Sequence, residues 1–219
     1  MIIMTDKKEF TVYEFFPTPV FLNNIDIDVD TEKFLINSTF VRMSSGNGNF
    51  SKNHYILDDE ICKSFVDKLF FQLNLYVDKY LHTDDSNFEW YMQNSWVVEH
   101  EPNDFGQQHH HANSLVSGVY YLDVPKNSGS ICFHKPNGHT NIFHMSTNIP
   151  YKEYTPINSD KYKIEPNKGD LILFPSHLLH SIDKNESNNK RYSLAFNFHI
   201  KGTLGSKDSK IDYLNLIGR

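Results

Sequence analysis

The stretch that decides the fold begins Gln108-His109-His110-His111-Ala112 and continues, after three residues, into Val116-Ser117-Gly118-Val119-Tyr120-Tyr121-Leu122. The second part is rich in β-branched and aromatic residues, which is typical of a strand. If the first part is also extended, side chains alternate between two faces, so that His109 and His111 project together while His110 points away. Two histidines on one face can hold a metal ion, although a solvated loop with three adjacent histidines would look the same.

Similar short apolar runs surround this stretch and predict the class of fold. From Trp90 onward they occupy residues 96–98, 116–124, 130–133, 170–174 and 193–200, with turns between them. Several short strands without intervening helices predict a sandwich or barrel. Before them we expect a strand over 9–16, a short helix starting near Asp30, and a longer helix over 58–81 from its apolar spacing. The prediction is a mainly β core with N-terminal helices packed outside it.

Composition and charge restrict the function classes. The 219 residues predict one domain, 1–219, with a helical part at about 28–85 and a β-core at about 90–202. The chain has 21 Lys+Arg against 27 Asp+Glu and no run of five or more like charges, so we do not expect a nucleic-acid groove. It also has no apolar stretch long enough for a membrane span, and we expect a cytoplasmic protein. Cys62 and Cys132 lack paired spacing, which argues against disulfides and a thiolate zinc site. Histidine is the excess, with 10 of 12 between His100 and His199.

Two later segments add candidate ligands. Residues 171–180 predict a buried strand that runs into a loop carrying His177 and His180, either of which could instead cap the strand end. In the next apolar run, alternation places Leu194, Phe196, Phe198 and Ile200 on one face and Arg191, Ser193, Ala195, Asn197 and His199 on the other. Arg191 and Ser193 together could clamp a carboxylate, because a guanidinium binds it with two N–H groups and a hydroxyl adds a third donor. A surface arginine at a strand end is the alternative.

Four motifs in this order carry a resemblance to a known family. They are Phe15-Phe16-Pro17-Thr18-Pro19-Val20-Phe21, His109-x-His111-x-x-Ser114-x-x-Ser117-Gly118-Val119-Tyr120-Tyr121, Gly169-Asp170-Leu171-x-Leu173-Phe174-Pro175-Ser176-x-x-x-His180 and Arg191-x-Ser193-x-Ala195-Phe196-Asn197-Phe198. The chain resembles a family of Fe(II)/2-oxoglutarate-dependent oxygenases of phages and bacteria, related to the prolyl hydroxylases, over roughly residues 15–202. The family's fold is a double-stranded β-helix, which is a jelly roll.

The resemblance implies a role for particular residues. His109, His111 and His180 would hold Fe(II), with His180 preferred over His177 because it matches the family's distal ligand. Arg191 would bind the distal carboxylate of 2-oxoglutarate, assisted by Ser193 and by Tyr120. The implied reaction uses O₂ and couples the oxidative decarboxylation of 2-oxoglutarate to hydroxylation of a substrate, either a small molecule or a prolyl or other peptidyl group.

Several points stay open at the level of sequence. The wider superfamily has a carboxylate where His111 stands, and three imidazoles also suit catalytic zinc, so a three-histidine metal enzyme without 2-oxoglutarate is an alternative. A shifted register, with His110 and Ala112, would imitate the iron halogenases. A non-enzymatic jelly-roll binding module is the third hypothesis. We expect Asn94, Trp96, Asn197 and His100 near the substrate, and the chain is compatible with a homodimer.

Overall fold

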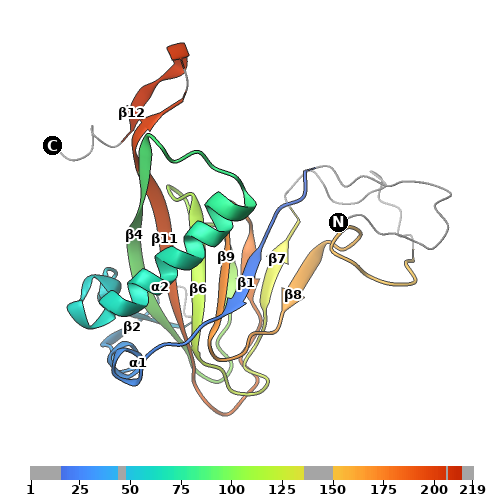
Figure 1. Cartoon of the computed structure of the whole chain (residues 1–219). Helices are drawn as coiled ribbons and strands as arrows, with labels where there is room; N and C mark the ends of the chain where they lie inside the picture. The colour runs from blue at the N-terminus through green and yellow to red at the C-terminus, as the bar shows by residue number, and fades with distance from the viewer. Residues whose placement is uncertain (1–15, 44–47, 136–149, 206, 214–219) are drawn as a thin grey trace.

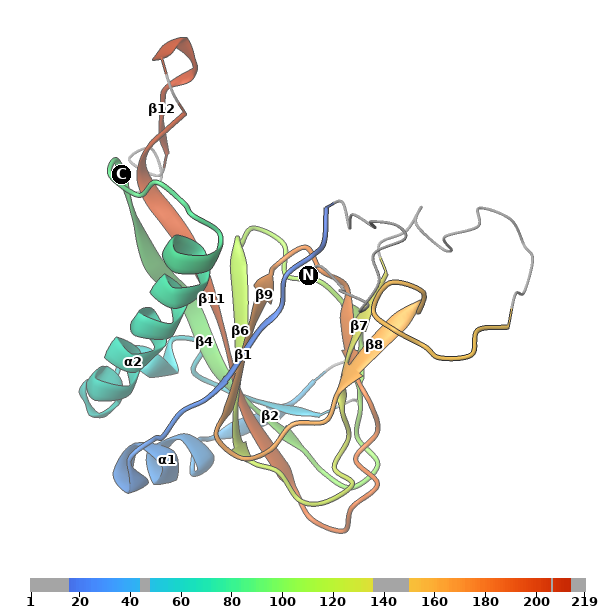
Figure 2. The same ribbon diagram turned by 45° about the vertical axis from the view of Figure 1, so that its right-hand side comes forward.

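Two antiparallel sheets face each other in this protein (Figures 1 and 2). The structure, a computed structural model, describes residues 16–43, 48–135, 150–205 and 207–213. The larger sheet has the order β1-β9-β6-β11-β4-β3-β2, with β12 added to β11, and the smaller has the order β5-β10-β7-β8. The strands of the larger sheet are β1 Phe21–Asn24, β2 Phe40–Arg42, β3 Asn49–Ser51, β4 Phe88–His100, β6 Val116–Asp123, β9 Asp170–Pro175, β11 Arg191–Leu204 and β12 Ile211–Tyr213. Those of the smaller sheet are β5 Gly106–His109, β7 Ile131–His134, β8 Lys161–Ile164 and β10 His180–Ile182.

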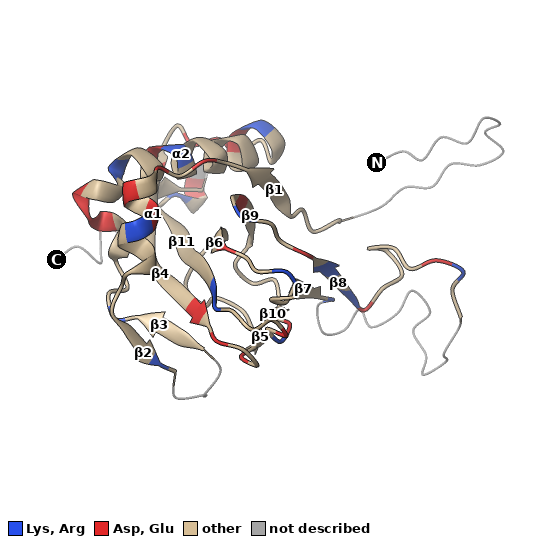
Figure 3. Ribbon diagram, turned by 90° about the horizontal axis from the view of Figure 1, so that it is seen from below, with Lys and Arg blue, Asp and Glu red and all other residues tan. Residues whose placement is uncertain are grey.

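The helices cover the outer face of the larger sheet, as Figure 3 shows from below. They are α1 Val29–Ile36 and α2 Lys63–Asn74, which continues as a π-helical segment Leu75–Tyr80; short 3₁₀ turns occupy Ile56–Asp58, Glu60–Cys62 and Lys207–Ser209. Asp28 caps α1, because its carboxylate accepts a hydrogen bond from the Thr31 N–H at 2.9 Å. In α2, Phe65, Leu69 and Leu73 recur at helical spacing and are buried against the sheet. This stripe is therefore core packing.

Alternation along the central strands divides the larger sheet into two apolar faces. On β6, Tyr120 and Leu122 pack with the helices, whereas Tyr121 packs in a second cluster between the sheets with residues of β7 and β9. Gly118 is required in this strand, because a Cβ there would lie 2.2 Å from a ring carbon of Phe196 on the neighbouring β11. Every second side chain of each strand therefore points into the space between the two sheets, on the face of the larger sheet that carries the candidate site.

The predicted fold class is confirmed: the protein is mainly β, with a jelly-roll core and outer helices. The apolar runs lie in β4, β6, β7, β9 and β11. Two details differ. The helix expected over 58–81 is divided into a 3₁₀ turn, α2 and the π-helical segment. The helical part at 28–85 also contains β3, which pairs with β4, and β2, which pairs with β3. The strand expected over 9–16 lies almost wholly outside the described residues, and the single-domain boundary of 1–219 stays a prediction.

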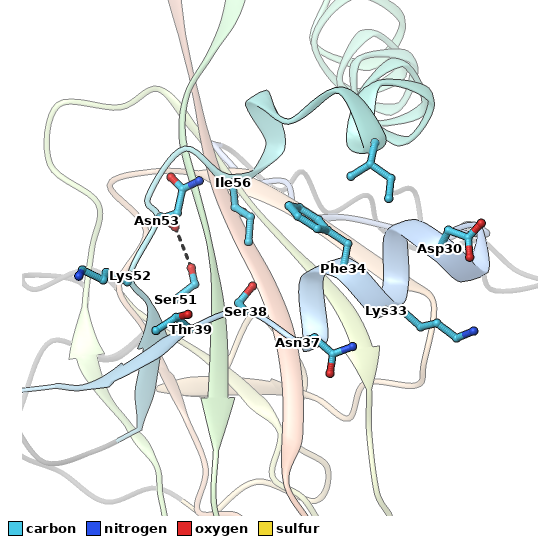
Figure 4. A pocket seen from close by; sticks show the side chains of 11 residues that line it. Asp30, Lys33, Phe34, Asn37, Ser38, Thr39, Ser51, Lys52, Asn53 and Ile56 are labelled. Carbon is cyan, nitrogen blue, oxygen red and sulfur yellow. Dashed lines mark hydrogen bonds between the residues drawn. The ribbon is translucent and has the colours of Figure 1, made fainter.

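A cavity of about 850 Å³ lies on the outer side of the larger sheet (Figure 4). Phe34 and Ile56 contribute apolar surface, and Lys33, Asn37 and Lys52 lie among the polar residues around them. None of the histidine or arginine candidates from the sequence lines it. Within the described segments, no helix is both long enough and apolar enough to cross a lipid bilayer.

Candidate functional site

Three histidines, of which His109 is exposed, His111 partly buried and His180 buried, meet beside the smaller sheet. His109 ends β5, His111 follows it in the next loop, and His180 begins β10. In the β5–β10 pair His180 lies directly opposite His109, so that both side chains project to the same face. One nitrogen of each of the three imidazoles lies within 4.8 Å of the others. The three histidines that the resemblance implied as ligands thus come together, and their role in binding metal stays a prediction.

Hydrogen bonds fix how each imidazole can act. Nδ1 of His109 lies 2.7 Å from the Gln107 carbonyl oxygen, Nδ1 of His111 lies 2.6 Å from Oδ1 of Asn197, and Nδ1 of His180 lies 2.9 Å from the Leu178 carbonyl oxygen. A carbonyl oxygen can only accept, so each Nδ1 carries the proton. Each Nε2 is therefore left with a free lone pair, which is the form that binds a metal.

Burial keeps two of these rings neutral. The pKa of His180 is lowered to about 3 by burial, with the neighbouring His109 adding to the effect. Burial also lowers the pKa of His111, against the raising effect of its hydrogen bond to Asn197. Neutral imidazole is the ligand form, so both rings are ready to coordinate at neutral pH without first losing a proton.

Asn197 anchors the middle histidine. Its Oδ1 accepts from His111 and from Oγ of Ser117 at 2.7 Å, and its Nδ2 donates to Oδ1 of Asn94 at 2.7 Å. Ser117 also lies 2.8 Å from Oγ of Ser176, whose carbonyl accepts from the His111 backbone N–H at 2.9 Å. Asn94 and Asn197, which were expected near a substrate, therefore lie behind the histidine cluster, and Asn197 orients His111 directly. The two serines were not predicted.

Trp96 covers the other side of His111. The two rings stack with centroids 5.8 Å apart and planes at 29°, and Phe50 and His54 pack against the indole from β3 and the following loop. The indole Nε1 is buried and has no hydrogen-bond partner among the described residues. Trp96 thus lies beside the histidine cluster, as the sequence analysis expected.

Arg191 lies deeper in the interior, at the start of β11. It is 1% exposed and is one of the largest fully buried side chains. Its Nη1 donates to the carbonyl oxygens of Ser128 at 3.2 Å and Gly129 at 3.1 Å, and its Nη2 donates to Nδ1 of His100 at 2.6 Å. All three acceptors are neutral, and burial lowers the pKa of Arg191. The alternative of a surface arginine is excluded.

The charge of Arg191 has no counterion in the described part of the chain. No ion pair there includes Arg191, and the nearby carboxylate of Asp104 is held by Arg42 at 2.5 and 2.6 Å. Nε of Arg191, the Tyr121 hydroxyl and Oγ of Ser128 are also buried without partners in this region. Because an unpaired buried cation is costly, such a group is expected where a bound anion completes it.

The prediction for Tyr120 is wrong. Its hydroxyl donates to the Ile25 carbonyl at 3.0 Å, and its ring packs on Phe65 of α2, outside the interior. Tyr120 pairs with Leu194 of the helix-facing side, whereas its neighbour Tyr121 pairs with Ser193, on the face that carries Arg191. Tyr121 and Ser193 are both buried there. The pKa of Tyr121 is raised to about 12 by burial, so its hydroxyl stays a donor.

The other histidine candidates lie outside the cluster. His110 and His177 are exposed, and neither belongs to the group of ligand atoms. The shifted register with His110 and Ala112 is therefore contradicted by the structure. His109, His111 and His180 fit one metal ion with three imidazole ligands, and the unpartnered donors around Arg191 fit a carboxylate. The residues present thus suit Fe(II) and 2-oxoglutarate together.

Three solved structures illustrate the similarity of this fold to known proteins. A Pseudomonas putida prolyl-4-hydroxylase is 15% identical with a TM-score of 0.54, covering 83% of this chain and 92% of its own. HygX of Streptomyces hygroscopicus, with nickel and 2-oxoglutarate bound, is 11% identical with a TM-score of 0.56 over 83% and 82% of the two chains. A 2OG-Fe(II) oxygenase family oxidoreductase of Burkholderia pseudomallei is 10% identical with a TM-score of 0.54 over 77% and 75%. These likenesses establish the fold.

No curated protein sequence matches the chain. Residues 94–197 match the profile of the family described as "Putative 2OG-Fe(II) oxygenase". The matched segment contains Arg191 and the three histidines that the fold brings together, His109, His111 and His180. The chain is therefore similar to the 2-oxoglutarate- and Fe(II)-dependent oxygenases, in sequence over residues 94–197 and in fold over most of its length.

Proposed function

We propose that the protein hydroxylates a prolyl or other peptidyl group, with His109, His111 and His180 as the Fe(II) ligands and with Arg191, Tyr121 and Ser193 as the 2-oxoglutarate contacts. The observation that carries these roles is the buried guanidinium of Arg191, which lacks a counterion in the described chain and lies on the same face of β11 as Asn197, the residue that is hydrogen-bonded to His111. A three-histidine enzyme that does not use 2-oxoglutarate would leave this cation without a purpose.

The chain's own residues bind and orient the reactants. Arg191 and Tyr121 donate to one carboxylate of 2-oxoglutarate at the deep end, and the three histidines hold the metal at the other. The three imidazoles would supply three ligands to the metal, which would leave coordination positions for the keto acid and for O₂. Bound Fe(II) supplies the oxidative chemistry, which converts 2-oxoglutarate and O₂ to succinate and CO₂ while one oxygen atom enters the substrate.

Turnover of 2-oxoglutarate is the direct test. Under anaerobic conditions, adding 2-oxoglutarate to the protein with Fe(II) should give a visible charge-transfer absorption band, and admitting O₂ should release succinate. Zinc that survives dialysis, together with hydrolase activity and no succinate, would contradict the proposed use of 2-oxoglutarate. A protein whose melting temperature is unaffected by Fe(II), Mn(II) and 2-oxoglutarate would instead support a binding module.

The substrate class is proposed from fold similarity to the Pseudomonas prolyl-4-hydroxylase, whose chain is covered over 92% of its length. Fold similarity by itself does not fix a substrate. Proline-containing peptides should therefore raise succinate release above the uncoupled rate and gain about 16 Da, the mass of one oxygen atom. Stimulation only by small molecules would overturn the peptidyl assignment and leave the oxygenase assignment intact. The homodimer stays a prediction, which light scattering can test.

The adjacent tyrosines provide a matched pair of variants. Tyr121→Phe should weaken 2-oxoglutarate binding roughly tenfold, because it removes one hydrogen bond to a charged group. Tyr120→Phe should leave binding unchanged and lower the free energy of unfolding by about 1 kcal/mol, because its hydroxyl bonds only the Ile25 carbonyl in the described chain. Calorimetry with Mn(II) in place of Fe(II) and chemical denaturation give the two quantities. Weaker 2-oxoglutarate binding by Tyr120→Phe, with unchanged binding by Tyr121→Phe, would assign the 2-oxoglutarate contact to Tyr120 instead.

A further inference from the structure

His100 faces Arg191 across the β4–β11 pair. The two residues are directly opposite in register, at the deep end of the interior, and they are 4% and 1% exposed. Nδ1 of His100 accepts a hydrogen bond from Nη2 of Arg191 at 2.6 Å. A guanidinium can only donate, so the imidazole carries its own proton on Nε2. Within the described residues, Nδ1 of His100 is the one side-chain atom that accepts a hydrogen bond from Arg191.

The imidazole is held both neutral and in place. The pKa of His100 is lowered to about 3 by burial, with the adjacent Arg191 lowering it further. Gly48, with a φ of 117°, packs against the ring, and a Cβ at that position would lie 3.1 Å from Cδ2 and 3.2 Å from Nε2 of His100. The backbone carbonyl of His100 also accepts from Nδ2 of Asn185 at 3.0 Å. The ring therefore has a fixed orientation toward Arg191.

The choice of acceptor has a consequence for charge. An aspartate at this place would form an ion pair with Arg191 and cancel the charge that a bound carboxylate needs. A neutral imidazole accepts one N–H and leaves the charge intact, as the carbonyls of Ser128 and Gly129 also do. The carboxylate whose charge acts on His100, that of Asp104, is held by Arg42 and by the Glu101 N–H. Every described contact thus orients the guanidinium without neutralising it.

We propose that His100 is a positioning residue for the co-substrate: it aims the Arg191 guanidinium at the distal carboxylate of 2-oxoglutarate while leaving its positive charge available. This inference rests on the proposed binding of 2-oxoglutarate by Arg191. His100 acts through Arg191 and does not touch the reacting atoms. Its removal should therefore change the affinity for 2-oxoglutarate and its KM more than kcat.

Three substitutions of nearly equal size separate the possible effects. His100→Asn places an amide oxygen close to the position of Nδ1, His100→Leu has the same branched shape without an acceptor, and His100→Asp adds a negative charge. The dissociation constant of 2-oxoglutarate is measured by calorimetry on the full chain with Mn(II) bound. Steady-state KM and kcat with Fe(II) follow, together with melting temperatures in the absence of metal and 2-oxoglutarate.

We expect His100→Asn to bind 2-oxoglutarate nearly as well as the parent, His100→Leu to bind about tenfold more weakly, and His100→Asp roughly 100-fold more weakly. His100→Asp should nevertheless melt at the highest temperature of the three, because its carboxylate completes the buried cation. A purely structural role predicts that affinity follows melting temperature across the series. The positioning role predicts that the two orders differ.

The control is His82→Asn, which removes an exposed histidine with a φ of 57°, a conformation that asparagine tolerates. It should bind 2-oxoglutarate like the parent. Equal binding by His100→Leu and His100→Asn would overturn the positioning role, and undiminished binding by His100→Asp would overturn the argument from charge. If the parent protein does not bind 2-oxoglutarate, the proposed function fails first, and this result is distinct from either outcome for His100.

Discussion

Arg191→Met should abolish 2-oxoglutarate binding at concentrations that saturate the parent protein. Removing one partner of a buried charge pair costs about 3–5 kcal/mol, which corresponds to roughly 10²–10⁴-fold weaker binding. Methionine keeps the unbranched apolar stem, so packing in the interior is largely preserved. The variant should show no charge-transfer band on addition of 2-oxoglutarate to the anaerobic Fe(II) protein, and 2-oxoglutarate should not raise its melting temperature.

The same variant should fold well without ligands. It loses three hydrogen bonds, to Ser128, Gly129 and His100, but it also removes a buried cation that has no counterion in the described chain. These effects oppose each other, so we expect the free energy of unfolding to change by less than about 2 kcal/mol. Arg42→Met is the matched control, because Arg42 is partly exposed and pairs with Asp104 instead. If Arg191→Met bound 2-oxoglutarate as well as the parent protein does, Arg191 would be excluded as a 2-oxoglutarate contact.

Alternation along a strand predicted the face of β11 that carries Arg191, but it could not correct the role that the resemblance implied for Tyr120. In β11 the two faces differ in chemistry, with Leu194, Phe196 and Phe198 opposed to Arg191 and Asn197, so the parity of the strand can be read from the residues. In β6 both faces are buried and both carry tyrosine, so nothing local distinguishes Tyr120 from Tyr121. Which tyrosine faces the site depends on the register with which β6 pairs to β11, and this register is set by tertiary structure.

The smaller sheet was the least predictable part of the fold. β5 and β10 contain glycine, glutamine, histidine and serine, which have little intrinsic preference for strands. They are strands because they pair with each other and because β10 also pairs with β7. The same pairing brings His180 opposite His109, so the histidine cluster depends on contacts between residues some 70 positions apart in the sequence. The order of the four sequence motifs allowed the three histidines to be proposed as ligands, although the strands that carry two of them, β5 and β10, could not be predicted.

The hydrogen-bond partners of the ligands could not be derived from the sequence for a similar reason. Two of the three Nδ1 acceptors are backbone carbonyls, which every residue carries, and only the geometry selects those of Gln107 and Leu178. The third, Asn197, lay on the polar face of β11 in the sequence pattern, but its bond to His111 depends on the loop after β5. His100 was expected near the substrate, whereas its position opposite Arg191 follows from the β4–β11 register.

His180→Ala should eliminate metal binding, whereas His177→Ala should leave it unchanged. A metal present at 100 times its dissociation constant raises the free energy of unfolding by about 2.7 kcal/mol, if it binds only the folded protein. Loss of one of three ligands should remove nearly all of this stabilisation. His177 lies three residues earlier in the chain and is exposed, which makes it a close control. Denaturation with and without Mn(II) measures both variants, and equal metal stabilisation of the parent and His180→Ala would exclude His180 as a ligand.

Acid titration of the metal-free protein gives an independent readout of the same residue. Burial lowers the pKa of His180 to about 3, below its value of about 6.5 in an unfolded chain, so between these values the unfolded state binds more protons. The free energy of unfolding must therefore fall as the pH falls from about 6.5 towards 3, and His180 contributes up to about 1.4 kcal/mol per pH unit. His180→Ala should lose this contribution and respond less steeply to acid, while the buried His100 still contributes in both proteins. His177→Ala should keep the parent slope. A variant that loses metal stabilisation but keeps the full acid slope would show that His180 is not the buried, neutral imidazole on which the metal site depends.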